Sequence, residues 1–252
     1  MEFYDSRCFA LWGDNKAGWV HSEGENGVEG VLSMWHKEAF EYSSHVKGRG
    51  FLAVTGVHTK LNCLCIVVDV YVACSLSDKA VMWEALSNIR RVNQNEVWCC
   101  CGDFNAVRSI EEMKGVRGFS SQKREIKEYN EFSDKNVLVE LPIVGKKFTW
   151  YKSDGSAKSR LDKFLVSLEW LQMWPMSKQY VQPREVSDHC VVVAKSWVKD
   201  WGPRPFKTID AWLSKFGFMD LVKGKWNNYE VQGNRMSKLK DKLKFLKGDL
   251  KE

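Results

Sequence analysis

The sequence predicts an α+β protein with one large core built on layered sheets. Its 252 residues are 44% hydrophobic and 28% charged, a balance that excludes an intrinsically disordered chain. Apolar, β-branched runs follow one another with only a few helical segments between them. A doubly wound parallel sheet requires strict alternation of strand and helix, so the order of segments favours a layered α+β sheet protein.

The strands are predicted from short runs of β-branched and aromatic residues that are bounded by glycine or polar turn residues. Gly102 is expected to end one of these strands, and Lys152–Ser156 is typical of a turn. The predicted strands are Val31–Trp35, Phe51–Thr55, Leu64–Val72, Val97–Cys101, Phe148–Tyr151, Arg160–Val166 and Cys190–Ala194.

Two helices are predicted between these strands, because apolar residues recur there at helical spacing. Ser77 and Asp78 are expected to cap the first helix, since both residue types accept hydrogen bonds from free N–H groups at a helix start. The second helix is expected over residues 122–137. The apolar face is formed by Met82, Leu86, Ile89 and Val92 in the first helix, and Ile126, Tyr129 and Ser133 share a face in the second.

The pattern changes after Ala194, and the chain is predicted to divide into residues 1–198 and residues 199–252. Trp201–Pro205 holds two prolines and predicts a rigid connector to C-terminal amphipathic helices. One helix is expected after a Thr208 cap, with Ile209, Trp212, Phe216 and Met219 on one face. The last helix is expected to carry an apolar stripe that is flanked by lysines. The stripe is expected to pack on a neighbouring element, and the alternative is that the basic face beside it rests on nucleic acid. The stripe is Met236, Leu239, Leu243, Leu246 and Leu250.

The charge and the cysteine content of the sequence indicate which class of partner and which cellular compartment to expect. The formal net charge of +6 permits a polyanionic partner such as nucleic acid. The most apolar stretch, Cys63–Cys74, is too short to span a bilayer, and no secretory signal or membrane attachment is expected. None of the eight cysteines has C-x-x-C spacing, which disfavours zinc. A reducing nuclear or cytoplasmic location is therefore expected. The sequence also predicts no obligate protein partner.

The string Cys100–Asn105 places a carboxylate and an amide where an apolar strand ends. In an extended strand, residues i and i+2 point to the same side, so Asp103 and Asn105 are expected to project together. A carboxylate can take a proton or hold a metal ion, and an amide can hydrogen-bond a phosphate oxygen. An ordinary turn is the alternative, because Gly, Asp and Asn are all turn formers.

Two further strings carry titratable residues. Asp188 and His189 are adjacent just before a predicted strand, and a carboxylate keeps a histidine oriented and charged for general acid or base chemistry. A polar strand start is the alternative. Arg160 and Asp162 are expected on one face of their strand, where an ordinary ion pair is the alternative.

Taken in order, these strings resemble the endonuclease/exonuclease/phosphatase family, which has the fold of DNase I. The strings are Gly102–Asn105, Phe148–Trp150, Ser159–Asp162 and Ser187–His189. Gly30–Trp35 and Trp170–Pro175 make the sequence most similar to the endonuclease domains of plant LINE-type non-LTR retrotransposons. The resemblance implies a four-layer α/β sandwich, in which two packed mixed sheets are flanked by helices.

For the site, the resemblance implies hydrolysis of a phosphodiester in DNA, with Mg²⁺ or Mn²⁺ as the cofactor. Asp103 would help to activate the attacking water, and His189 would contact the phosphoryl oxygen with Asp188 as its partner. Tyr71 is implied as a catalytic residue at a strand end, and Asn105 would orient the phosphate. The implied metal ligands are Asp103, Asn105 and Asp188, and the implied supporting or substrate-binding residues are Thr149, Arg160, Asp162 and Ser187.

The sequence departs from the family at the front. The family carries a Trp-Asn-x-Arg-Gly string and a metal-binding Glu in a Gln-Glu-Thr-Lys string, and neither string occurs here. The chain is therefore expected to lack the first strand-helix-strand unit of the fold, and its activity to be impaired. Two alternatives are a catalytically inactive nucleic-acid-binding remnant and a phosphatase of the same superfamily.

Overall fold

The computed structural model describes residues 2–23, 30–72, 75–115, 119–196 and 215–250. The chain forms two compact units, residues 1–198 and residues 199–252. None of the helices in the described ranges combines the length and apolar character that crossing a bilayer requires.

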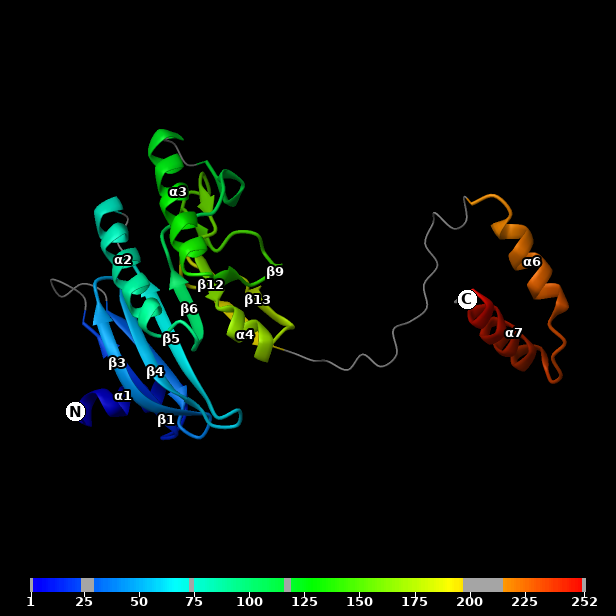
Figure 1. The fold of residues 1–252 in the computed structure, drawn as a ribbon, viewed down its shortest axis with the longest axis horizontal. Coiled ribbons are helices and arrows are strands. Elements are labelled where there is room, and N and C mark those ends of the chain that lie inside the picture. Colours follow the sequence, from blue (N-terminus) through cyan, green and yellow to red (C-terminus); the bar gives the residue numbers. More distant parts are fainter. Residues whose placement is uncertain (1, 24–29, 73–74, 116–118, 197–214, 251–252) are drawn as a thin grey trace. The chain divides into compact units, whose positions relative to one another are not determined.

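A six-stranded mixed sheet forms the centre of the first unit (Figure 1). Its strand order is β3-β4-β5-β6-β12-β8, and the neighbours β5 and β6 are parallel while the other pairs are antiparallel. The strands are β3 (Phe40–Gly48), β4 (Phe51–His58), β5 (Cys63–Tyr71), β6 (Val97–Asp103), β12 (Asp162–Val166) and β8 (Val139–Glu140).

Two helices, α2 (Leu76–Val92) and α3 (Phe119–Lys135), cover one face of this sheet (Figure 1). The strands present alternate residues to these helices, and the side chains of Trp83 and Phe132 stack between them with ring centroids 4.4 Å apart. The buried core includes Val68, Val70, Trp98, Cys100 and Leu165 from the sheet, and Met82, Leu86 and Tyr129 from the helices. Burial of this apolar surface is the main stabilising contribution to the unit.

The opposite face of the sheet is covered by two smaller sheets. The hairpin of β1 (Ala17–Ser22) and β2 (Val31–His36) lies over β4 and β5, and Ser33 donates a hydrogen bond to Asp69 there. The three-stranded sheet of β9, β13 and β14 lies over the other end, where Cys99, Leu141 and Val166 form a second core. The elements here are β9 (Ile143–Gly145), β13 (Ser177–Val181), β14 (Val192–Ser196), α1 (Glu2–Trp12) and α4 (Leu168–Met173).

The described structure confirms the α+β architecture and corrects several element boundaries. Ser75, rather than Ser77 or Asp78, caps α2, because its hydroxyl accepts the N–H of Asp78 at 3.1 Å. The strand expected to end at Gly102 continues to Asp103, and Gly102 adopts a positive φ of 121° that a side chain would oppose. Val92, predicted on the apolar face of α2, is exposed at the end of the helix.

Several short elements were not predicted, and the predicted strand at residues 148–151 is shorter than expected. A small sheet is formed by β10 (Trp150–Tyr151), β11 (Lys158–Ser159) and β7 (Met113–Lys114), and the short 3₁₀ helix η2 (Ile110–Glu112) precedes it. α1, β1, β3, β9 and β13 also lacked a prediction. The side chains of β3 are almost all partly or fully exposed, so no alternating apolar pattern marks this strand.

The second unit contains two helices, α6 (Phe218–Asn228) and α7 (Arg235–Asp249). Tyr229 donates to Asp249 at 2.7 Å, and Lys242 donates to the carbonyl of Trp226 at 2.8 Å. Within this unit, Met236, Leu239 and Leu243 of the apolar stripe are 76%, 45% and 52% exposed, whereas Leu246 and Leu250 are half-buried. The packing expected for this stripe stays a prediction. Most of the helix expected after Thr208 lies outside the described residues.

Candidate active site

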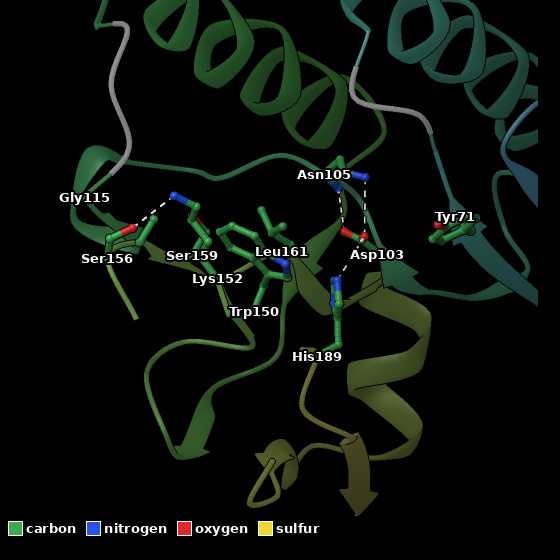
Figure 2. Close-up of a pocket in the computed structure, with 11 residues that line it drawn as sticks. Tyr71, Asp103, Asn105, Gly115, Trp150, Lys152, Ser156, Ser159, Leu161 and His189 are labelled. Atoms are coloured by element: carbon green, nitrogen blue, oxygen red, sulfur yellow. Dashed lines mark hydrogen bonds and ion pairs between the residues drawn. The ribbon is translucent and has the colours of Figure 1, made fainter. Parts of the chain in front are cut away.

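Asp103 and Asn105 lie together where β6 ends, as Figure 2 shows. The Oδ1 atom of Asp103 accepts the backbone N–H of Asn105 at 2.8 Å, and Asn105 Nδ2 donates to the carbonyl of Val72 at 2.7 Å. The two side chains meet through a turn rather than an extended strand, since Asn105 has a φ of 44°. The expected proximity is confirmed, and the turn considered as its alternative is what creates it.

His189 approaches Asp103 from a distant part of the sequence (Figure 2). It lies just before β14 and bridges to Trp150, and its Nε2 atom is 3.9 Å from Asp103 Oδ2. The other ring nitrogen, Nδ1, is 2.9 Å from Oδ2 of Asp162. Asp162 begins β12, which pairs with β6 so that Asp162 lies directly opposite Asp103. The sheet register therefore brings both carboxylates to one histidine.

The surroundings of Asp103 and His189 shift the pKa values of both side chains. Burial raises the pKa of Asp103 to about 6, and the nearby Asp162 carboxylate contributes to this rise. The hydrogen bond to Asp162 raises the pKa of His189 above its ordinary value. Near neutral pH the site therefore pairs a mostly ionised Asp103 with a histidine that retains its proton more readily than usual.

Thr149 organises the backbone that carries Asp162. Its side chain is fully buried, and its hydroxyl oxygen accepts the N–H groups of Leu161 and Asp162 at 2.9 and 3.0 Å. Its carbonyl accepts the N–H of Cys190 at 2.7 Å. Thr149 thus fixes the segments on both sides of the histidine–carboxylate pair from beneath the surface.

These residues open onto a cleft with a volume of about 1130 Å³ (Figure 2). Asp103, Asn105 and His189 lie along it, Tyr71 lies at one end, and the turn that carries Lys152 lies at the other. The complete lining is Tyr71, Asp103, Asn105, Gly115, Trp150, Lys152, Ser156, Ala157, Ser159, Leu161 and His189. The lining residues come from strands β5, β6, β10 and β11 and from the loops beside them.

The structure changes the partner expected for His189. Asp188 is exposed, and its Oδ2 atom accepts the indole N–H of Trp150 at 2.9 Å, a bond that lowers the pKa of Asp188. The ring of His189 is held by Asp162 instead. Adjacent residues near a strand point to opposite sides, which separates the carboxylate of Asp188 from the ring of His189.

Two more predicted site residues lie away from the cleft lining. Ser187 is exposed, and its hydroxyl accepts the backbone N–H of His189 at 3.1 Å. Arg160 pairs with Glu112 and lies 3.1 Å from Glu140, so it does not form the expected pair with Asp162. Lys163 joins the same buried group through Glu112 at 2.7 Å. These ion pairs connect β12 and the residue before it to the segment that follows β6. Their role is structural.

Sequence patterns missed one buried residue that acts on the site. Lys79 of α2 is 3% exposed, and its Nζ atom donates to the carbonyl of Asn105 at 2.6 Å. Glu125 of α3 lies 3.5 Å from the same ammonium group. A lysine on a polar helix start is ordinarily a solvated side chain, so nothing in the sequence marks it. Trp150 and Leu161 also line the cleft, and the sequence predicted no role for either residue beyond membership of a motif.

The described residues contain no group of three His, Cys, Asp or Glu side chains arranged to hold a metal ion. Of the expected set, Asp103 and Asn105 line the cleft, whereas Asp188 accepts the indole N–H of Trp150 and is not part of that lining. Asp188 as a metal ligand stays a prediction. Asp103 remains a buried carboxylate that faces the cleft. Mg²⁺ is commonly bound by one or two carboxylates together with water and substrate phosphate, and Asp103 fits that limited role.

Comparison with solved structures decides the fold. The endonuclease domain of TRAS1, a telomere-specific non-LTR retrotransposon, is 12% identical to this chain with a TM-score of 0.55, and the match covers 77% of this chain and 91% of that domain. The chain has the DNase I-like fold. An endonuclease/exonuclease/phosphatase family protein from Leptotrichia buccalis is 15% identical with a TM-score of 0.52, covering 78% and 77% of the two chains.

A third structure, the endonuclease/exonuclease/phosphatase from Bacteroides vulgatus, is 10% identical with a TM-score of 0.51, covering 77% of this chain and 79% of that one. No protein-family model and no curated protein matches the sequence. The predicted fold class is thus confirmed, and its similar structures include a retrotransposon endonuclease domain. The closer likeness to plant LINE elements stays a prediction.

Proposed function

We propose that this chain hydrolyses phosphodiester bonds in DNA as a divalent-metal-dependent endonuclease derived from a retrotransposon. The observation that carries the proposal is the Asp103–His189–Asp162 arrangement at the cleft, with distances of 3.9 and 2.9 Å. It pairs an ionisable base with a charged hydrogen-bond donor, which is what attack of water on a phosphodiester requires. The likeness of the fold to a retrotransposon endonuclease domain favours DNA as the substrate.

In this proposal Asp103 accepts the proton of the attacking water. Its burial raises its pKa to about 6, so it is largely ionised above neutral pH yet more basic than an exposed aspartate. The backbone N–H of Asn105 holds Oδ1 at 2.8 Å, and the side-chain amide of Asn105 donates more distantly to Oδ2, at 3.4 Å, the oxygen that would take the proton. Asn105 would therefore orient both Asp103 and the phosphate beside it.

His189 donates a hydrogen bond to a nonbridging phosphate oxygen in the same proposal. Asp162 accepts from its Nδ1 atom, which directs Nε2 toward the cleft and keeps the ring protonated over a wider pH range. Charge develops on the phosphate oxygens in the transition state, so a donor fixed in advance lowers the barrier. Tyr71, at the other side of Asp103 in the cleft, would contact the substrate backbone.

We propose Mg²⁺ or Mn²⁺ as the cofactor, with Asp103 as its protein carboxylate. A bound divalent cation neutralises charge on the phosphate and on the leaving oxygen. A single carboxylate positions such an ion less well than several, and about 1 Å of misplacement costs on the order of a hundredfold in rate. The proposed hydrolysis is therefore slow.

The test compares two substrates in parallel, supercoiled plasmid DNA and p-nitrophenyl phosphate, with wild type and H189A. We expect slow Mg²⁺-dependent nicking of the plasmid that H189A reduces by about a hundredfold, within the usual contribution of a general acid or base. Wild-type turnover of the phosphate monoester without nicking of DNA would favour a phosphatase instead. Nicking that H189A leaves unchanged would contradict the proposed site.

A further inference from the structure

The net positive charge of this protein comes from residues 199–252. Residues 1–198 hold 25 Lys and Arg against 25 Asp and Glu, so the unit that contains the cleft is formally neutral. Residues 199–252 hold 13 Lys and Arg against 7 Asp and Glu, which accounts for the entire net charge of +6. Nonspecific affinity for nucleic acid comes chiefly from phosphate contacts by Lys and Arg. The unit with the cleft has no excess of such charge.

Helix α7 holds six Lys and Arg residues, and three of them share one face. Lys240, Lys244 and Lys247 are spaced by four and three residues, so they lie on the same side of the helix. All three are exposed. With a rise of about 1.5 Å per residue, the three lysines span about 10 Å of the helix axis.

The internal contacts of the unit do not account for this face. Asp249 is bound by Lys225 at 3.2 Å and by Tyr229, and Lys242 is bound to the carbonyl of Trp226. Within the described residues, no ion pair with a carboxylate joins Lys240, Lys244 or Lys247. Like charges at this spacing destabilise a helix by a few tenths of a kcal/mol. The helix dipole favours only a lysine in the last turn, which is Lys247.

We infer that the exposed lysine face of α7, formed by Lys240, Lys244 and Lys247, binds the phosphate backbone of nucleic acid. The inference rests on the proposed function, because it assigns nonspecific affinity for the substrate to the C-terminal unit, which carries the net positive charge of the chain. A polyanion removes the mutual repulsion of the three lysines and releases its own counterions. Such binding follows the backbone and is independent of base sequence.

The experiment measures binding of a short DNA duplex to the full chain in EDTA, so that hydrolysis does not interfere. The variant K240Q/K244Q/K247Q is compared with wild type and with a matched control, K47Q/K60Q/K178Q, whose three lysines are exposed on the first unit. Glutamine is a good helix former, so α7 is retained, and circular dichroism checks this. Affinity is measured between about 50 and 200 mM salt, the range in which phosphate contacts weaken most visibly.

We expect the α7 variant to bind DNA at least about tenfold more weakly at the lower salt concentration, with the salt slope reduced by about one for each lost contact. The control variant should bind like wild type. Equal binding by the α7 variant and wild type, or an equal loss in the control, would overturn the inference. Loss of binding to anionic phosphatidylserine vesicles with DNA binding retained would also overturn it.

These outcomes are separate from the test of hydrolysis. A normal α7 variant in the binding assay, together with nicking that H189A abolishes, rejects the binding role alone. Loss of DNA binding in the α7 variant, together with nicking that H189A leaves unchanged, rejects the proposed site and retains the binding role.

Discussion

The Nδ1 atom of His189 lies 2.9 Å from Oδ2 of Asp162, although Asp188 is its neighbour in the sequence. The pairing follows from the sheet, because β12 sets Asp162 opposite Asp103 and the segment before β14 delivers the histidine between them. The tautomer and the charge of the histidine are therefore controlled by a residue 27 positions away.

Replacing Asp162 with asparagine should move the alkaline limit of hydrolysis to lower pH. The hydrogen bond and charge of Asp162 raise the pKa of His189, so their removal lets the ring lose its proton earlier. The measurement is the pH–rate profile of plasmid nicking for wild type and D162N. The matched control is D188N, which should shift the profile less, since Asp188 is held by Trp150. A larger shift in D188N would contradict the pairing.

In the protein without metal, burial raises the pKa of Asp103 to about 6. A cation on the same carboxylate would lower this pKa, so the acidic limit of hydrolysis should lie below pH 6. The raised pKa affects the stability of the metal-free protein. A carboxyl whose pKa is raised by folding contributes stability below its unfolded pKa and loses it as the pH rises through the folded pKa. D103N should therefore lose this component of the pH dependence of unfolding between about pH 4 and pH 6. Urea unfolding across that window measures it, and an identical profile in D103N would be contrary to the assigned burial.

Thr149→Val should destabilise the first unit by about 1–3 kcal/mol for each buried N–H group that loses its acceptor. The side chains have similar shapes, and the hydroxyl accepts the N–H groups of Leu161 and Asp162. Urea unfolding gives the change in free energy. Thr149→Ser retains the hydroxyl and should recover much of the loss. Equal stability of wild type and T149V would show that these bonds are unimportant.

Lys79→Met should slow hydrolysis by about tenfold to a hundredfold without an equal loss of DNA binding, because small displacements of catalytic groups are costly. Lys79 donates to the carbonyl of Asn105 at 2.6 Å and so positions the turn that follows Asp103. Single-turnover rates and binding affinity are measured separately. K123M is the control, since Lys123 is exposed on α3. Parallel losses in rate and binding for K79M would indicate general unfolding.

Much of the core and part of the site could be predicted from the sequence. The long β-branched run that became β5 and the helical spacing of Met82 and Leu86 carry strong periodic signals. β3 carries none, because most of its side chains face solvent. Asp103 and His189 belong to sequence motifs that predict a functional role, and the structure brings both residues to one cleft.

The hydrogen-bond and ion-pair partners of the site residues could not be predicted from the neighbouring sequence. Asp162 reaches His189 through strand register, and Arg160 pairs with Glu112, which lies 48 positions away in the sequence. Lys79 contacts Asn105 across 26 positions of sequence. Such contacts depend on how elements pack, and no single-sequence pattern encodes that packing.

The most direct test of the central claim is single-turnover nicking of supercoiled plasmid by wild type and by D103N, purified in parallel, with excess protein and Mg²⁺. We predict slow wild-type nicking that EDTA abolishes and that D103N reduces by about a hundredfold or more, the range for loss of a general base. Nicking that is equal in D103N, or no nicking by wild type at any Mg²⁺ or Mn²⁺ concentration, would contradict the claim that this cleft hydrolyses DNA.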